Sequence, residues 1–257
     1  MKKSETTRPL LGIVVPVLND TAALVALIPQ LRPLQERGAR WVVVDGGSVE
    51  SERLHAQDLI REAGGLWLSA PRGRALQMNA GAEALLSNQA VSALWFVHAD
   101  SGLPRDADLL IHNALMHHAW GRFDVRIKGR SRCLPTVARM MNWRSRVTHI
   151  STGDQGLFMR RGTFERLAGF APIALMEDVE MSRRLKRLGP PACLREQLVT
   201  SGRRWDDHGA LRTIMLMWAL RFRYWCGASP EALHRRYYRT QTDDLVQPQG
   251  TATPHSP

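Results

Sequence analysis

Four short acidic and glycine-bearing patches are the residues of this chain best suited to chemistry. They are Val44-Asp45-Gly46-Gly47-Ser48, His98-Ala99-Asp100, Gly153-Asp154-Gln155-Gly156 and Glu177-Asp178. The first two patches each follow an apolar run. Because the carboxyl ends of parallel strands meet at one edge of an α/β sheet, we expect these carboxylates to converge on one site. Such a site is suited to a metal-bound nucleotide.

Asp45 and Asp100 each have a chemical and a structural interpretation. Asp45 follows four apolar residues and precedes two glycines, so it could accept hydrogen bonds from a base or ribose, or form an ordinary Asp-Gly turn. Asp100 could bind Mg²⁺ or Mn²⁺, which often use only one or two carboxylates together with substrate phosphates. It could equally cap the turn before Pro104.

Glu177 and Asp178 stand directly before a helix expected from Val179. A helix dipole favours carboxylates at this end, so the pair could be an N-terminal cap. Alternatively, one carboxylate could be a general base that removes a proton from an attacking hydroxyl.

Two basic segments could meet an anion. Arg72 and Arg74 flank a glycine at the entrance of a helix, where guanidinium groups and the helix dipole can bind a diphosphate. A solvated basic turn is the alternative. A later polar cluster could be another part of the site or a surface turn; its members are Arg203, Arg204, Trp205, Asp206, Asp207 and His208.

The elements that must position these residues alternate regularly in the first half of the chain. Apolar runs predict strands at 10–18, 41–44, 66–69 and 93–97, and helical spacing predicts helices around 24–31 and at 51–63, 74–86 and 106–118. Pro33 and Gly38 are expected to limit the first helix. Four strands alternating with helices predict βαβ units and a mostly parallel sheet in an α/β domain.

The second half shows a less regular pattern. Past Gly121 we expect loops between shorter elements, then helices at 179–188 and 211–225. Residues 1–9 are expected to be a flexible N-terminus, and the polar segment 240–257 a disordered tail. These boundaries predict one domain with two halves, 10–120 and 121–239, the second ending in a C-terminal helical region.

The net charge indicates which partners the protein binds, and the cysteines and targeting signals indicate its cellular compartment. The chain has 257 residues, 44% of them hydrophobic, and a formal net charge of +11, so it can bury a full core and favours anionic partners. Those partners include a nucleotide diphosphate, an acidic membrane surface and nucleic acid. Three widely spaced cysteines and the lack of a signal peptide or membrane span lead us to expect a cytoplasmic protein.

In this order the patches resemble the family 2 glycosyltransferases, which have the GT-A fold. The resemblance covers roughly residues 10 to 210 and is carried by Val14–Asp20, Val43–Ser48, Asn79-Ala80-Gly81, His98-Ala99-Asp100, Gly153–Gly156 and Met176-Glu177-Asp178. More narrowly, Ser69–Asn79 with Phe96–Asp100 looks like a bacterial subgroup labelled as radical-SAM and selenodomain-associated, or arsenosugar-biosynthesis, transferases.

The resemblance implies a role for each matching residue. The half 10–120 would bind a nucleotide-diphosphate sugar, with UDP as the default nucleotide. Pro16 and Asn19 would lie in the loop under the nucleotide base, and Asp45 would bind the base. Arg72 and Arg74 would lie near the base or the diphosphate, and Asn79, in the motif Asn79-Ala80-Gly81, would also belong to the donor-binding residues. Asp100 would hold a divalent cation, Mg²⁺ or Mn²⁺.

On the acceptor side, the resemblance implies that Asp178 is the general base of an inverting displacement and that Glu177 supports it. Gly153 and Asp154 would border the acceptor and the donor sugar. Arg204 and Trp205 lie where processive relatives carry Q-x-x-R-W, and His208 would be an additional metal ligand.

Some positions depart from the family pattern. His98 replaces the first carboxylate of the usual D-x-D, and Ser201 stands where the glutamine of Q-x-x-R-W would be. The expected activity is transfer of a sugar from a nucleotide-diphosphate donor to an unidentified hydroxyl acceptor.

The alternative is a basic protein with the same fold and no transferase activity that binds nucleic acid or a membrane surface. No nucleic-acid-binding motif accompanies the charge, so we expect no nucleic acid partner. The Trp- and Met-rich segment 211–225 could touch the inner face of a membrane as an amphipathic element or pack on the core.

Overall fold

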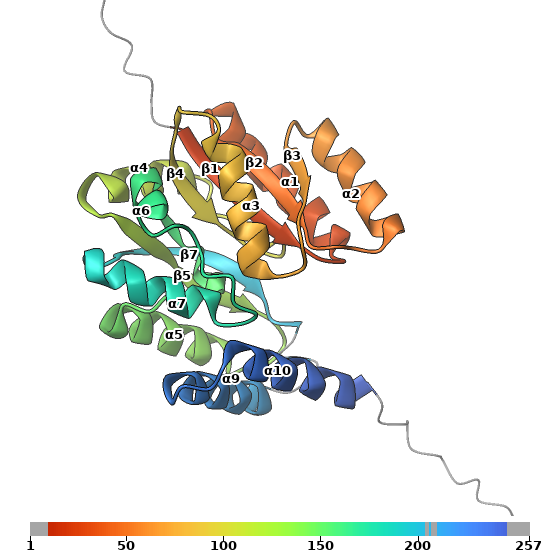
Figure 1. Cartoon of the computed structure of the whole chain (residues 1–257), viewed down its shortest axis with the longest axis vertical. Helices are drawn as coiled ribbons and strands as arrows, with labels where there is room; N and C mark the ends of the chain where they lie inside the picture. The colour runs from red at the N-terminus through yellow and green to blue at the C-terminus, as the bar shows by residue number, and fades with distance from the viewer. Residues whose placement is uncertain (1–9, 204–205, 207–209, 246–257) are drawn as a thin grey trace, which may run out of the picture.

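The computed structural model describes residues 10–203, 206 and 210–245, and its centre is one mixed sheet of seven strands (Figure 1). The spatial order is β3-β2-β1-β4-β6-β5-β7. The strands are β1 (Leu10–Val17), β2 (Arg40–Asp45), β3 (Leu66–Ser69), β4 (Val91–Phe96), β5 (Trp120–Lys128), β6 (Phe158–Arg160) and β7 (Ala192–Ser201).

The first four strands are parallel to one another, as the sequence predicts. Helices connect them: α1 (Thr21–Glu36), α2 (Glu50–Glu62), α3 (Arg74–Leu86) and, after β4, α4 (Ala107–His117). Only β6 runs antiparallel to its neighbours β4 and β5, while β5 and β7 are parallel. The predicted α/β class with a mostly parallel sheet is confirmed.

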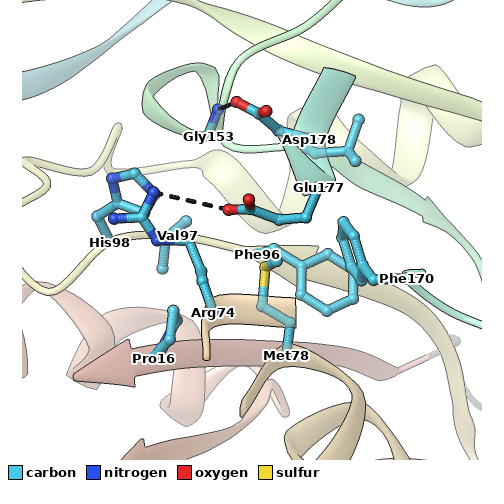
Figure 2. A pocket seen from close by; sticks show the side chains of 11 residues that line it. Pro16, Arg74, Met78, Phe96, Val97, His98, Gly153, Phe170, Glu177 and Asp178 are labelled. Atoms are coloured by element: carbon cyan, nitrogen blue, oxygen red, sulfur yellow. Dashed lines mark hydrogen bonds and ion pairs between the residues drawn. The ribbon is translucent and has the colours of Figure 1, made fainter. Parts of the chain in front are cut away.

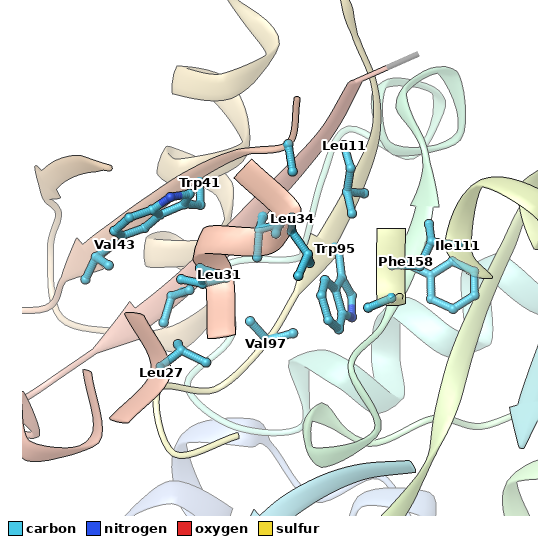
Figure 3. Close-up of a cluster of buried hydrophobic side chains, with 14 of the residues drawn as sticks. Leu11, Leu27, Leu31, Leu34, Trp41, Val43, Trp95, Val97, Ile111 and Phe158 are labelled. Carbon is cyan, nitrogen blue, oxygen red and sulfur yellow. The ribbon is translucent and has the colours of Figure 1, made fainter. Parts of the chain in front are cut away.

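Alternating residues of the central strands supply two cores, one on each face of the sheet. Ile13, Trp41 and Trp95 face a cluster with residues of α1, α2 and α4, part of which Figure 3 shows. Val14 and Phe96 face the opposite cluster with α3, α6 (Arg161–Arg166) and α7 (Glu177–Leu185). Each fully buried aliphatic side chain stabilises the fold by about 1.5–3 kcal/mol, so burial on both faces fixes the sheet.

Helix α3 lies unusually close to the sheet because it carries Gly81. A β-carbon at this position would lie 2.6 Å from a methyl group of Val14 and 2.8 Å from one of Val44. This close approach brings the start of α3, with Arg74, to the carboxyl ends of β1 and β2.

The second half is more regular than we predicted from the sequence. In place of short elements, β5 is a strand of nine residues, β7 a strand of ten residues and α5 (Leu134–Thr148) a helix of fifteen residues. The charges of β5 hide its strand pattern, because Arg122 is fully buried and bonds to Asp124 instead of facing solvent. Tertiary pairing therefore overrides the polar sequence.

Two predicted boundaries are also wrong. Helix α1 contains Pro33 and continues to Glu36, so Pro33 does not limit it; it ends two residues before Gly38, whose positive φ fits the predicted limit at that glycine. Residues 240–245 are the last part of α10 (Pro230–Leu245), so they are helical and not part of a disordered tail. The flexible N-terminus predicted at 1–9 and the remaining tail, 246–257, lie outside the described residues.

The C-terminal helices α9 (Ala210–Trp225) and α10 pack against the chain just before α7. Leu220, Leu233 and Tyr237 form a buried cluster with Met176, which directly precedes α7. Within the described residues, no helix is long and apolar enough to cross a membrane.

Candidate functional site

One hollow brings together six of the predicted site and motif residues at the carboxyl ends of β1 and β4 (Figure 2). It has a volume of about 320 Å³, including its open mouth. Pro16 comes from β1, Arg74 from the start of α3, His98 from the loop after β4, Gly153 from the turn η1 (Gly153–Gln155), and Glu177 and Asp178 from the start of α7. Its apolar lining consists of Met78, Phe96, Val97, Leu157 and Phe170.

Asp178 is held at the edge of this hollow by two backbone N–H groups. Its Oδ2 accepts a hydrogen bond of 2.8 Å from Gly153 N, and its Oδ1 accepts one of 2.7 Å from Val179 N. A carboxylate offers about four acceptor positions, so both oxygens keep capacity for a further donor. The carboxylate is therefore fixed in orientation and still able to receive a proton from a hydroxyl.

Glu177 has a different environment from its neighbour. Its side chain is buried, and Arg74 Nη1 lies 3.7 Å from its Oε1, as Figure 2 shows. Burial raises the pKa of Glu177, the charge of Asp178 raises it further, and Arg74 and His98 oppose the shift. The chain thus places a carboxyl group that resists ionisation beside one whose oxygens are both hydrogen bonded.

His98 occupies the first position of the motif that ends in Asp100, and it packs on Gly153. A β-carbon at Gly153 would lie 2.6 Å from His98 Nε2, so only glycine fits against the imidazole. The other ring nitrogen, Nδ1, lies 3.4 Å from Asp154 Oδ1. Asp154 also accepts a hydrogen bond of 3.3 Å from the hydroxyl of Thr200 in β7. The loop after β4 and η1 are therefore coupled directly.

Helices α5 and α7 fix the backbone of the segment that carries Gly153. Ser151 N donates to the Ser182 hydroxyl of α7 at 3.1 Å. Thr152 N donates to Gln155 Oε1 at 3.2 Å, and the amide nitrogen of Gln155 lies 3.4 Å from Asn142 Oδ1 of α5. Because these partners are buried, the Gly153 N–H that holds Asp178 has a fixed position.

Asp45 lies at the end of β2, one strand away from Pro16. It is buried, and its carboxylate accepts hydrogen bonds from Gly47 N at 3.2 Å and Ser48 N at 3.1 Å, which fixes the turn after β2. Asn19 joins that turn to the loop after β1, since its Oδ1 accepts from Val49 N at 2.8 Å. With strands about 4.8 Å apart, the ends of β2 and β4 are separated by about 10 Å along one edge.

Asn79 is bound to backbone at both ends of its amide. Its Nδ2 donates to Phe170 O at 2.8 Å, and its Oδ1 accepts from Phe170 N at 2.8 Å. Phe170 lines the hollow, so Asn79 holds one wall of it. Asn79 thus has a structural role at a position where the sequence predicts a residue that binds the nucleotide sugar.

The remaining predicted residues lie away from the hollow or outside the described part. Arg72 is exposed in the loop before α3, and Asp100 lies in the turn after β4. Arg204, Trp205 and His208 are outside the described residues. Of the predicted metal ligands, the structure therefore places only Asp100.

The described side chains at the site could hold a divalent cation only together with ligands from a substrate. No group of three or more His, Cys, Asp or Glu side chains that could hold a metal ion occurs within the described part of the chain. A single carboxylate such as Asp100 still suits Mg²⁺ or Mn²⁺ when substrate phosphates supply most ligands. The residues present fit a metal that arrives with its substrate.

Sequence reasoning missed several residues that build or border the site. Gln77 is buried, and its amide donates to Val17 O and Val44 O, each at 2.8 Å, which ties the ends of β1 and β2 together. Arg144 of α5 and Arg221 of α9 carry charges that Asp178 acts on. Gln77 stands within the predicted motif region, whereas no local pattern links Arg144 or Arg221 to Asp178.

The fold is that of the GT-A-type glycosyltransferases, and solved structures of this class are similar to the chain over three quarters of its length. The sequence itself matches no family model and no curated protein.

Three solved structures illustrate the similarity. A mannosyltransferase from Pyrobaculum calidifontis in complex with GDP-Man and Mn²⁺ is 18% identical over 76% of this chain and 57% of its own, with a TM-score of 0.53. The 1-349 fragment of S. aureus TarS in complex with UDP is 14% identical over 74% of this chain and 60% of its own, with a TM-score of 0.57. The M. tuberculosis glucosyl-3-phosphoglycerate synthase is 17% identical over 75% and 71%, with a TM-score of 0.53. The chain thus spans less than two thirds of the first two.

Proposed function

We propose that this protein is a glycosyltransferase that moves a sugar from a nucleotide-diphosphate donor to a hydroxyl acceptor with inversion at the anomeric carbon. The observation that carries the proposal is Asp178, which Gly153 N–H holds at a hollow formed by the carboxyl ends of two parallel strands. Similar structures contain GDP-Man or UDP-GlcNAc, which supports a nucleotide-sugar donor. UDP is the default nucleotide.

The donor would lie along the edge from β2 to β4, with residues 10–120 as the donor half. We assign Pro16, Asn19 and Asp45 to the nucleoside, because they occupy the ends of β1 and β2 and the turns that follow. Arg72 and Arg74 would meet the diphosphate, since guanidinium groups at a helix N-terminus bind phosphate well. Asn79 would support this side by holding Phe170.

A divalent cation, Mg²⁺ or Mn²⁺, would be held by Asp100 and His208 and would supply positive charge against the charge that develops on the leaving diphosphate. Arg74, which lines the hollow, would add a further positive charge. Preorganised charge of this kind is usually the largest catalytic contribution.

Asp178 would accept the proton of the acceptor hydroxyl. The hydroxyl oxygen then bonds to the anomeric carbon while the bond from that carbon to the diphosphate oxygen breaks, so the nucleoside diphosphate leaves with the bonding electrons. Glu177 would support the base, and Gly153 and Asp154 would border the reacting groups. By resemblance, Arg204 and Trp205 belong to the same side, in the acceptor half 121–239.

The substitution Asp178→Asn tests the assignment of the base. General-base catalysis contributes about 10²- to 10⁴-fold, so release of nucleoside diphosphate from the nucleotide sugar should fall by that factor. Binding of the nucleoside diphosphate, measured by thermal shift, should stay unchanged. Glu180→Gln, three residues after Glu177 on the same helix, is the matched control and should retain turnover. Normal turnover by Asp178→Asn would exclude this base.

A thermal-shift screen of nucleoside diphosphates, with and without Mn²⁺, should identify the nucleotide of the donor. A ligand at a concentration about 100 times its Kd stabilises the folded state by about 2.7 kcal/mol, which is a readily measured rise in Tm. A rise with one nucleotide that requires the metal supports both donor and cation. No rise with any nucleoside diphosphate would overturn the proposed function.

The narrower grouping with the radical-SAM-associated bacterial transferases is also a proposal, supported by the stretch Ser69–Asn79. The alternative of a nucleic-acid-binding protein without transferase activity is not favoured, because the similar structures are glycosyltransferases.

We also propose peripheral contact between a membrane surface and residues 211–225, at the inner face of the membrane if the protein is cytoplasmic. The supporting observation is that one side of α9 exposes large apolar side chains instead of packing on the core. These are Met215, Trp218, Phe222 and Trp225, which are 62–77% exposed. Helix α5 exposes Met140, Trp143 and Val147 at the same helical spacing. Vesicle sedimentation tests this contact.

A further inference from the structure

Arg144 and Arg221 are two arginines on which the charge of Asp178 acts, and no carboxylate in the described part of the chain forms an ion pair with either of them. Helices α5 and α9 lie near each other in Figure 1, and the two arginines are close enough for the charge of Arg221 to act on Arg144. Among the described residues, neither arginine has a carboxylate within ion-pair distance.

Three nitrogen atoms of these two guanidinium groups are buried without a hydrogen-bond partner among the described residues. Nε and Nη2 of Arg144 and Nε of Arg221 have no hydrogen-bond partner in the described part of the protein. A buried polar group without a partner is uncommon, because folding removes the water that would otherwise bind it. These buried N–H groups can therefore still donate hydrogen bonds to an acceptor that is not among the described residues.

Neighbouring charges do not remove the excess of positive charge. Arg122 and Arg146 both bond to Asp124, so that carboxylate is already shared by two arginines. Burial, together with the charges of Arg221 and Arg122, lowers the pKa of Arg144 to about 10 against the opposing effect of Asp178. Arg144 nevertheless stays charged at neutral pH. The segment 128–148, which contains α5, has six basic residues and no Asp or Glu.

We propose that Arg144 and Arg221 bind an anionic group, a phosphate or a carboxylate, on the acceptor substrate. Guanidinium groups recognise such anions through paired N–H donors. An anion held there would fix the acceptor on the α5 and α9 side of Asp178, so that its hydroxyl reaches the base. The inference rests on the proposed function and specifies its acceptor as an anionic compound, either soluble or a lipid headgroup.

The test uses the full chain and glycerol 3-phosphate, titrated with saturating nucleoside diphosphate and Mn²⁺ so that the donor site is filled. Hydrogen bonds to charged groups contribute about 1.5–3 kcal/mol, so Arg144→Met and Arg221→Met should each weaken binding about 10- to 100-fold. Arg139→Met and Arg223→Met, exposed arginines on the same two helices, are the matched controls and should bind like the wild type. Arg144→Lys keeps the positive charge and replaces Arg144→Met in the test if that variant fails to fold. It should bind glycerol 3-phosphate weakly, because an ammonium group lacks the paired N–H donors of a guanidinium group.

A second arm replaces the soluble probe by a monomeric short-chain phosphatidic acid, which carries the lipid headgroup without a membrane surface and so does not report the surface contact proposed for α9. Loss of this binding in both arginine variants, but not in the controls, with no binding of glycerol 3-phosphate, assigns the anion to a lipid. Equal binding by variants and wild type in both arms would overturn the proposal. So would a matching loss of nucleoside diphosphate binding in the variants, because the arginines would then serve the donor. Failure of the proposed function is seen separately, as no nucleoside diphosphate binding by the wild type.

Discussion

Glu177 and Asp178 are adjacent in the chain, yet tertiary packing gives their carboxyl groups opposite surroundings. Asp178 receives two backbone N–H groups, whereas Glu177 is buried behind it and faces a half-exposed Arg74 at 3.7 Å. An ion pair with so exposed a partner contributes little. At the scale of single residues, the candidate site therefore contains one carboxylate with a fixed orientation and one carboxyl group whose ionisation the fold resists.

Glu177→Gln should make the protein more stable at pH 8. The fold raises the pKa of Glu177 above its usual value of 4.5. Between pH 4.5 and the raised pKa, the folded state therefore binds more protons than the unfolded state. The free energy of unfolding then falls as the pH rises through the folded pKa. The uncharged amide removes this loss. Thermal unfolding from pH 4 to pH 8 should show the gain in Tm shrinking toward low pH.

Glu180→Gln is the control for this measurement, because it removes the carboxylate of a partly buried ion pair of 2.6 Å with Arg184 on the same helix. It should give no gain at pH 8. A Glu177→Gln variant whose Tm is below that of the wild type at every pH would show that the carboxylate stabilises the fold.

At the scale of elements, the C-terminal helices support the segment that positions Asp178. Met176 has a left-handed backbone, with φ of 72°, directly before α7, and its side chain is buried against Leu220 and Tyr237. A non-glycine residue in this conformation costs about 1–3 kcal/mol and persists only when its surroundings hold it. Helices α9 and α10 supply those surroundings, so they belong to the site although they contribute no residue to the hollow.

Leu220→Ala should therefore affect both stability and activity. Its side chain is fully buried, and loss of a buried leucine costs about 2–5 kcal/mol of the free energy of unfolding. Turnover should fall more than nucleoside diphosphate binding. The cavity that the substitution leaves would lie next to Met176, at the start of α7, and away from the sheet edge proposed for the donor. Urea unfolding and turnover are the measurements.

Met215→Ala on the exposed side of the same helix is the control, and it should change stability by no more than about 0.5 kcal/mol. Equal losses of turnover and donor binding in Leu220→Ala would contradict the local role of α9.

At the scale of the whole molecule, charge and exposed apolar surface coincide. The chain carries +11, and neither 128–148 nor 210–230 contains an acidic residue. The same two segments expose Trp143, Trp218 and Trp225. Basic side chains beside exposed aromatic ones are typical of elements that lie on anionic membranes.

Anionic vesicles should therefore sediment this protein. Trp218→Ser combined with Trp225→Ser should weaken that binding by about 100-fold or more, since each buried aromatic contributes at least about 1.5 kcal/mol. Binding should also weaken as salt is raised above about 0.15 M, because the charges are then screened. Met116→Ser, an equally exposed apolar position on α4, is the control. Unchanged sedimentation of the double variant would place the contact elsewhere.

The sequence by itself determined the first half of the fold. Strands β1 to β4 and helices α2 to α4 are close to their predicted bounds, because continuous apolar runs and helical periodicity are local signals. The same local signals placed Asp45, His98 and Asp178 at element ends, and parallel strands gather their carboxyl ends at one edge of the sheet.

Only the tertiary structure decided the second half and the surroundings of the site. Strand β5 is disguised by Arg122 and Asp124, whose charges cancel only once they are buried together. The contact of Gly153 with His98, the backbone bonds of Asn79 and the approach of Arg144 and Arg221 to Asp178 join segments far apart in the chain. Such contacts depend on how elements pack, and no local periodicity encodes them.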